Sequence, residues 1–190
     1  MRMSRYSMKC DGFDQGTGYL PEALRGVARN HLASFDYFLD HGLSDVVRCL
    51  DNISIQPSGA QNTSSSPRFK MWFENISIGR PIREDTTAVR ARDPRVFPRE
   101  CRESSNTYKA PMLATVAWTF GDVGAIFRRE FRICMFPVMV ASKVCNLFGF
   151  SKDELICRGE EGHEMGGYFI LNGNERIIRL LVQQRRHYIM

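Results

Sequence analysis

Residues 165–182 decide the fold of this 190-residue chain; they read Met-Gly-Gly-Tyr-Phe-Ile-Leu-Asn-Gly-Asn-Glu-Arg-Ile-Ile-Arg-Leu-Leu-Val. Two apolar runs in this stretch flank the dipeptide Asn172-Gly173. Asn-Gly between such runs is the strongest short-range signal for a two-residue β-hairpin, because both turn positions need a positive φ. We therefore expect a hairpin here, with one strand entering the turn after Met165 and the other leaving it toward Val182.

A helical pattern precedes this hairpin in the chain. Pro21-Glu22 suits a first helical turn, and apolar residues then recur at helical spacing up to Leu50. Gly42 interrupts the pattern and is expected to end or kink a helix, which predicts either a helical hairpin or one bent helix. Because helices come first and strands follow, the expected fold class is α+β, with N-terminal helices packed on a mixed, mainly antiparallel sheet.

A period of two indicates strands later in the chain. We expect strands at residues 69–78 and 108–120, a partner strand at 125–133, and a short strand at 136–140. Residues 80–102 hold seven arginines and three prolines, which predicts an extended basic segment rather than a continuous helix. Ser151, with Glu154 three positions later, predicts a capping box that opens a short helix.

The composition is that of a globular protein with a mild basic character. Hydrophobic residues make up 43% and charged residues 25%, and the net charge of +5 favours anionic partners such as nucleic acid or acidic lipid. The longest apolar runs reach about half of the ~20 residues that a membrane span needs, and we find no secretory signal. Six cysteines without a C-x-x-C pair are expected to remain thiols in a reducing compartment, the cytosol or nucleus.

The common catalytic and cofactor motifs are missing. There is no phosphate-binding G-x-x-x-x-G-K-[ST] loop, and His163-Glu164 lacks the second histidine one turn later that a zinc protease site needs. The cysteines and histidines are too loosely spaced to predict a zinc site. The acid pair Glu160/Glu161 lies in a polar stretch typical of solvated charge. We therefore expect no catalytic residue and no metal site.

Arginine is concentrated in three places where it could meet phosphate oxygens: residues 80–102, the cluster Arg128, Arg129 and Arg132, and residues 175–187. The planar guanidinium donates two hydrogen bonds to one phosphate and stays charged. Four acids are interleaved in residues 80–102, so pairing on a solvated face is an equally good account there. Residues 175–187 contain one acid, which favours an anionic partner; an amphipathic membrane helix is the competing interpretation.

Four segments resemble, in the same order, motifs of the second-largest, β-like subunits of multisubunit DNA-dependent RNA polymerases. The glycine-hairpin stretch at residues 165–179 is the most specific match. The others are Ser34-Phe-Asp-Tyr-Phe-Leu-Asp-His-Gly-Leu43, Phe97-Pro-Arg-Glu-Cys-Arg102 with Thr107-Tyr108, and Phe136-Pro-Val-Met-Val-Ala-Ser-Lys-Val-Cys-Asn-Leu147. Among the paralogues, residues 142–147 and 179–186 look most like RNA polymerase I, with polymerases II and III as alternatives.

The resemblance implies an N-terminal protrusion domain, one wall of the cleft that holds DNA and the RNA–DNA hybrid, in the nucleus and nucleolus. Its partners would be the largest polymerase subunit, further subunits and initiation factors, with no membrane. The fragment would be part of a nucleotidyltransferase without supplying its catalytic residues. The magnesium of the active site and the zinc of the full subunit would lie elsewhere, which leaves no cofactor in this fragment.

The expected domain organisation follows from composition and resemblance together. Residues 1–18, with three glycines and little apolar periodicity, are expected to be a flexible leader. Residues 19–190 would form the protrusion domain, with a polar low-complexity loop at 57–67. Residues 183–190 are still apolar and patterned, which predicts a piece of a larger polypeptide, cut before an inserted lobe.

A cleft wall needs phosphate contacts that are independent of sequence, because the enzyme moves along any template. The residues expected to lie near nucleic acid are Arg102, Lys109, Arg179, Arg185 and Arg186. Each could equally pair with an acidic patch of a neighbouring subunit. Two other functions remain open: a freestanding nucleic-acid-binding module, and an interaction module whose basic tail docks on acidic protein or lipid.

Overall fold

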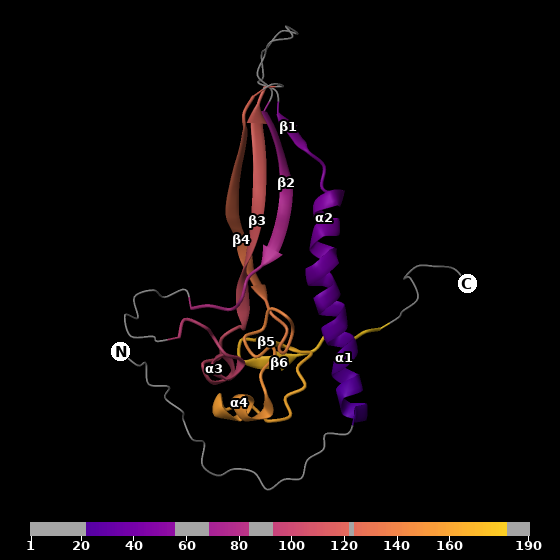
Figure 1. Cartoon of the computed structure of the whole chain (residues 1–190), viewed down its shortest axis with the longest axis vertical. Coiled ribbons are helices and arrows are strands. Elements are labelled where there is room, and N and C mark those ends of the chain that lie inside the picture. The colour runs from indigo at the N-terminus through magenta and orange to yellow at the C-terminus, as the bar shows by residue number, and fades with distance from the viewer. Residues whose placement is uncertain (1–21, 56–68, 84–92, 122–123, 182–190) are drawn as a thin grey trace, which may run out of the picture.

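The computed structural model describes residues 22–55, 69–83, 93–121 and 124–181. A helical rod, a long sheet and a base of short elements make up this part of the chain (Figure 1). The rod consists of α1 (Glu22–Tyr37), a π-helical turn η1 (Phe38–Gly42) and α2 (Leu43–Cys49). It runs alongside the base and part of the sheet (Figure 1).

The rod settles the two alternatives for the N-terminal helices: no helical hairpin forms, and one long helix does. Gly42 keeps helical backbone angles, with φ −58° and ψ −40°, so it does not end the helix. The residues Phe38–Gly42 form a π turn, which takes up an extra residue inside a helix without breaking it. Phe35 before the turn and Leu43 after it are both buried, so both helices contribute to the core.

Four antiparallel strands form the sheet, in the order β1 (Ile53–Ile55), β2 (Phe69–Ile78), β3 (Lys109–Phe120) and β4 (Ile126–Pro137). The strands predicted at 69–78 and 108–120 are confirmed. β4 runs beyond the predicted 125–133 and takes in Phe136 and Pro137, so the separate strand predicted at 136–140 is wrong. Met139 makes only an isolated bridge to Phe169. The three residues of β1 are too few to show a period of two, which is why the sequence did not predict this strand.

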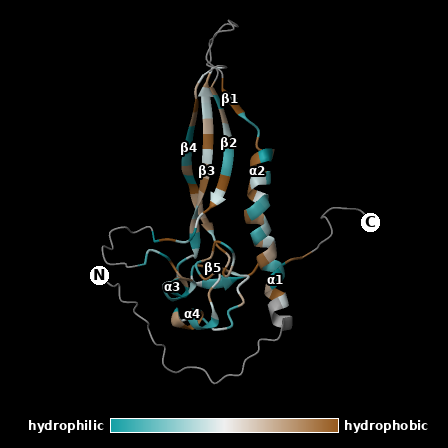
Figure 2. Ribbon diagram, in the orientation of Figure 1, coloured by the Kyte–Doolittle hydropathy of each residue, from teal (hydrophilic) through white to brown (hydrophobic). Residues whose placement is uncertain are grey.

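Two β-bulges decide which side chains stand on each face of the sheet. Glu74 in β2 and Ile133 in β4 are the extra residues, and each shifts the alternation of its strand by one position. We call the face on the side of the rod the inner face; there Ile78 packs in the same core cluster as Leu43. The opposite, outer face carries Lys70, Trp72, Lys109, Thr115, Arg128, Glu130 and Arg132. Hydrophilic and hydrophobic residues alternate along the strands (Figure 2).

The base holds α3 (Pro98–Glu103), α4 (Lys152–Cys157), β5 (Phe169–Leu171) and β6 (Asn174–Arg176). The segment predicted to be extended at 80–102 thus ends in a short helix. Proline favours that helix, because Pro98 occupies its first turn, where a missing N–H costs nothing. Residues 84–92 lie outside the described residues.

The predicted hairpin and capping box are both confirmed. Asn172 and Gly173 have φ values of 52° and 77°, as the Asn-Gly turn requires. The second strand is shorter than expected and ends at Arg176 instead of Val182. Ser151 and Glu154 exchange both hydrogen bonds of the capping box at the start of α4.

The core joins the rod, the root of the sheet and the hairpin. Tyr108, Val138, Val140 and Ile170 are fully buried in it. No described helix is long and apolar enough to cross a membrane. The expected leader at 1–18 and the expected loop at 57–67 lie outside the part of the chain that the structure describes.

Candidate nucleic-acid interface

The structure separates the five basic residues that the sequence predicted near nucleic acid. Lys109 is exposed at the start of β3, on the outer face of the sheet. Arg179 is exposed in the segment that follows β6. Arg185 and Arg186 lie outside the described residues. Arg102 lies in α3, on the base.

Arg102 is the centre of an ion-pair network that ties three parts of the base together. Its Nη1 donates to Glu160 at 2.8 Å, and its Nη2 donates to the Tyr168 hydroxyl at 2.8 Å. Nη2 also lies 3.6 Å from Glu164. Nε lies 2.8 Å from Glu175 Oε1, although the N–H is not aligned for a hydrogen bond. The guanidinium therefore faces three carboxylates and a phenol.

This network raises the pKa of Arg102. Burial opposes the charge, but the hydrogen bonds to Glu160 and Tyr168 and the nearby carboxylate outweigh it. A phosphate would have to displace acids that already hold the donors of this side chain. The geometry thus favours a structural role for Arg102, and its contact with phosphate stays a prediction.

Glu160 shows why this part of the base needs an arginine. Its side chain is only 1% exposed, and an unpaired carboxylate would be costly there. It accepts the backbone N–H of Arg99 at 2.7 Å, in the first turn of α3, as well as Nη1 of Arg102. The sequence placed this acid on a solvated surface, and that interpretation is wrong, because α3 covers it with the backbone N–H of Arg99 and the guanidinium of Arg102.

A second buried network, of hydrogen bonds, forms around the Tyr108 hydroxyl. It accepts the backbone N–H of Asn146 at 3.0 Å and lies 3.4 Å from Cys145 Sγ. The Asn146 amide nitrogen donates to the carbonyls of Pro81 and Val96, both at 2.8 Å. Burial is the main cause of the raised pKa of Tyr108. Two networks in the base, around Arg102 and around Tyr108, therefore bring together the motifs at 97–102, 107–108, 136–147 and 165–179.

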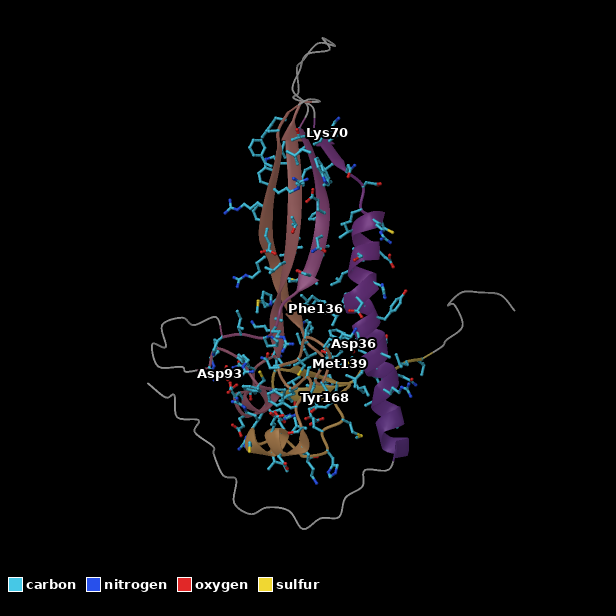
Figure 3. All side chains as sticks on the ribbon, viewed as in Figure 1. Asp36, Lys70, Asp93, Phe136, Met139 and Tyr168 are labelled. Carbon is cyan, nitrogen blue, oxygen red and sulfur yellow. The ribbon has the colours of Figure 1, made fainter. Side chains whose placement is uncertain are left out.

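The outer face of the sheet is the broad basic surface of the described residues. The outer face of β2 to β4 carries four basic residues against Glu130 and the bulged Glu74, whereas the rod has four acids against three arginines. Lys70, Lys109, Arg128 and Arg132 stand on the outer face by the register of the strands. Figure 3 places Lys70 near the end of the sheet away from the base, so this basic face runs along the length of the sheet.

Part of this charge is already paired within the sheet. Arg128 Nε donates to both oxygens of Glu74, at 2.9 and 3.0 Å, on an exposed surface. Such surface pairs are weak and exchange readily with other anions. The outer face can therefore bind the phosphates of a polyanion along the length of the sheet without reading its sequence.

The sequence did not predict that Lys70 belongs to this basic surface, or which arginines of the 128–132 cluster stand on it. The arginine cluster at 128–132 was recognised, but Arg129 stands on the inner face and only Arg128 and Arg132 on the outer face. Within 126–132, odd-numbered residues share one face and even-numbered residues the other, as the period of two of a strand would have predicted. Lys70 could be placed beside them only once the pairing of β2 with β3 was known.

An apolar groove of about 280 Å³ lies between the rod and the base, with Phe35, Phe136, Met139 and Phe169 among its lining residues. Figure 3 shows Phe136 and Met139 between the end of the sheet and the rod. His31 is the one titratable residue in its described lining. This lining offers no acid–base or nucleophile pair.

Comparison with known proteins assigns the class of protein. Residues 26–185 match the family model described as RNA polymerase beta subunit. Because the match covers most of the chain, the protein belongs to the RNA polymerase beta subunit family.

Curated relatives point to a particular branch of that family. DNA-directed RNA polymerase I subunit 2 of Arabidopsis thaliana is 32% identical over 165 residues, 87% of this chain and 13% of the relative. DNA-directed RNA polymerase I subunit RPA2 of Mus musculus is 32% identical over 179 residues, 92% of this chain and 15% of the relative. DNA-directed RNA polymerase III subunit RPC2 of Schizosaccharomyces pombe is 31% identical over 162 residues, 85% of this chain and 13% of the relative. The chain thus spans about one seventh of the length of these relatives.

Proposed function

We propose that this chain is the N-terminal part of the second-largest subunit of RNA polymerase I, and that it forms a wall of the DNA and RNA–DNA hybrid cleft during ribosomal RNA synthesis. The observation that carries this proposal is the match over residues 26–185 together with relatives named as polymerase I subunits. It deepens the family assignment by one step, from the family to the paralogue. The similarity to a polymerase III subunit makes polymerase III the competing assignment.

The expected partners follow from this assignment. The largest subunit and the other polymerase subunits would surround the domain, initiation factors would bind the assembled enzyme, and the enzyme would act in the nucleus and nucleolus. Nucleotidyl transfer would take place at metal ions held by other parts of the complex. The role of this domain would be positioning of the template, with Lys109 and its neighbours on the outer face contacting phosphates.

Affinity purification of the full-length subunit tests the assignment to polymerase I. We expect the largest subunit of polymerase I to copurify in equal amount, and the nucleolar ribosomal RNA genes to be enriched with it on chromatin. Copurification of the polymerase III largest subunit, with enrichment of polymerase III genes, would contradict the assignment while leaving the family unchanged.

A charge reversal tests the phosphate-binding role of the outer face. Polymerase assembled with Lys109→Glu should bind duplex DNA with a salt dependence whose slope, log K against log salt, falls by about 1 for the lost phosphate contact. Lys152→Glu, the same charge change on the exposed face of α4, is the matched control and should leave the slope unchanged. Equal slopes for both variants would refute the role of the outer face.

A further inference from the structure

The inner face of the sheet carries an aromatic patch at its far end, beyond the core. The patch consists of Phe69, Trp118, Phe120, Phe127 and Phe131, which share this face by the register of β2, β3 and β4. Four of the five rings contact one another: Phe69 and Phe120 at 5.3 Å between centroids, Trp118 and Phe127 stacked at 6.0 Å, and Phe120 and Phe127 edge-on at 6.5 Å. Lys70, labelled in Figure 3, marks the level of this end of the sheet.

The patch is open to solvent in the described part of the chain. Phe120 is 57% exposed, Phe127 49% and Phe131 43%. Large aromatic side chains are rarely left at a surface in this number, and a cluster of them marks an interaction site. The aromatic patch therefore needs an occupant.

Arg129 stands within this aromatic surface. It is directly opposite Val116 on the inner face, between Phe127 and Phe131 along β4. Its guanidinium carbon lies 5.3 Å from the centre of the Phe131 ring, a cation–π arrangement. Side chains two residues apart on a strand are separated by about 6.8 Å, about twice the 3.4 Å rise of one nucleotide in a strand. A base can therefore lie against a ring while its phosphate stays within reach of Arg129.

This combination of rings and cation suits an unpaired nucleic-acid strand. Proteins bind single strands by stacking bases on aromatic rings beside basic residues, without reading the sequence. By the register of the strands, Arg129 is the one basic residue on the inner face of β2 to β4, and no acid stands there with it. A polypeptide strand would need hydrogen-bond partners for its backbone groups. On the inner face of β4 beside the patch, Arg129 stands between Phe127 and Phe131 and is the one polar side chain of the three.

We infer that the aromatic patch, with Arg129, binds single-stranded DNA, such as the strand left unpaired when a duplex opens. A 2′-hydroxyl would meet two donors in the patch, Arg129 and the Trp118 indole N–H, and no acceptor. Nothing in the patch therefore selects RNA, and an opened duplex supplies DNA. The inference rests on the proposed function for the presence of an opened duplex. It differs from that function in placing the strand on the inner face of the sheet.

The two tryptophans of the chain report on the two faces separately. Trp118 belongs to the aromatic patch, whereas Trp72 pairs with Ala117 and stands on the outer face. We would titrate the 190-residue chain as Trp72→Phe and as Trp118→Phe with a twelve-residue oligothymidylate and follow tryptophan fluorescence. Stacking of bases on the patch should quench Trp118 with saturation and leave Trp72 unchanged.

Removal of one aromatic ring measures how much a stacked base contributes to the affinity for oligothymidylate. Phe127→Ala should weaken oligothymidylate binding about five- to 150-fold, the range for loss of one stacked base. Phe127→Leu should weaken it nearly as much, because leucine keeps apolar bulk without a π face, and Arg129→Gln should lower the salt dependence. Arg48→Gln, which removes an exposed arginine from α2, is the matched control and should bind as the parent does. Near-ultraviolet circular dichroism verifies that each variant is folded.

Each other outcome overturns the inference and is distinguishable from failure of the proposed function. Quenching of Trp72 alone would place the strand on the outer face, which keeps the proposed function and removes the aromatic site. Tighter binding of oligouridylate than of oligothymidylate would refute the choice of DNA. If Phe127→Leu binds DNA normally but the full-length subunit carrying it loses a polymerase subunit on purification, the patch is a protein interface.

Discussion

Removal of the Arg102 side chain should destabilise the chain strongly, because it would leave a carboxylate buried without its cation. Glu160 is 1% exposed and keeps only the backbone N–H of Arg99 at 2.7 Å. Breaking a buried pair by removing one partner costs about 3–5 kcal/mol, and we expect about 3 kcal/mol for Arg102→Ala, since that N–H remains. With an m-value of about 2 kcal/mol/M, the urea midpoint should fall by about 1.5 M.

A double-mutant cycle in urea isolates this interaction. Glu160→Gln should cost much less in the Arg102→Ala background than in the parent, because no buried charge is then left unpaired. A loss below about 1 kcal/mol for Arg102→Ala would refute the reasoning, and so would equal costs of Glu160→Gln in both backgrounds. Unchanged stability with a lower salt slope for DNA binding would instead support the phosphate contact predicted from the sequence.

Three further changes probe individual contacts in the base. Tyr108→Phe leaves the buried backbone N–H of Asn146 without its acceptor at 3.0 Å. Thermal or urea unfolding should reveal a loss of about 1–3 kcal/mol in the free energy of unfolding, and an unchanged stability would contradict this hydrogen bond. Gly166→Ala forces a side chain onto a φ of +66° and into neighbouring backbone, which should cost at least about 2 kcal/mol; a stable variant would show that the loop is free to move. Asp93 has its pKa lowered from 3.8 to about 2, chiefly by the hydrogen bond from Arg95. The stabilisation that Asp93 gives is therefore present above about pH 4 and lost between pH 4 and 2, so Asp93→Asn should lower stability slightly at pH 7 and not at pH 2, and a pH-independent difference would argue against the pair.

The sequence predicted those elements whose signals are local. The turn at Asn172-Gly173 requires φ values that few residues accept, and the capping box at Ser151 needs only a spacing of three. The strands at 69–78 and 108–120 are long enough to show their period. Each of these features depends on neighbours in the chain, and each is present in the structure.

The features that the sequence did not predict depend on contacts between distant segments. Glu160 looks like a solvated acid until Arg102, fifty-eight positions earlier, is brought beside it. The π turn at Phe38–Gly42 lies between two buried residues, Phe35 and Leu43, whose burial depends on contacts with segments far away in the chain. The candidate site is of the same kind: Lys70 joins the basic outer face through the pairing of β2 with β3.

Ile133, the extra residue in β4, has a consequence for how insertions and deletions are tolerated in this strand. Because one bulged residue separates Arg132 from Cys134 in the register, deleting it while Phe136 stays anchored in the core would exchange the two faces of residues 126–132. Phe127, Arg129 and Phe131 would then point outward, and Arg128 and Arg132 would turn toward the helices. Homologous chains that lack this residue are therefore expected to carry the opposite phase of charged and aromatic positions upstream of it. A sequence alignment that ignores the bulge would pair residues that stand on opposite sides of the sheet.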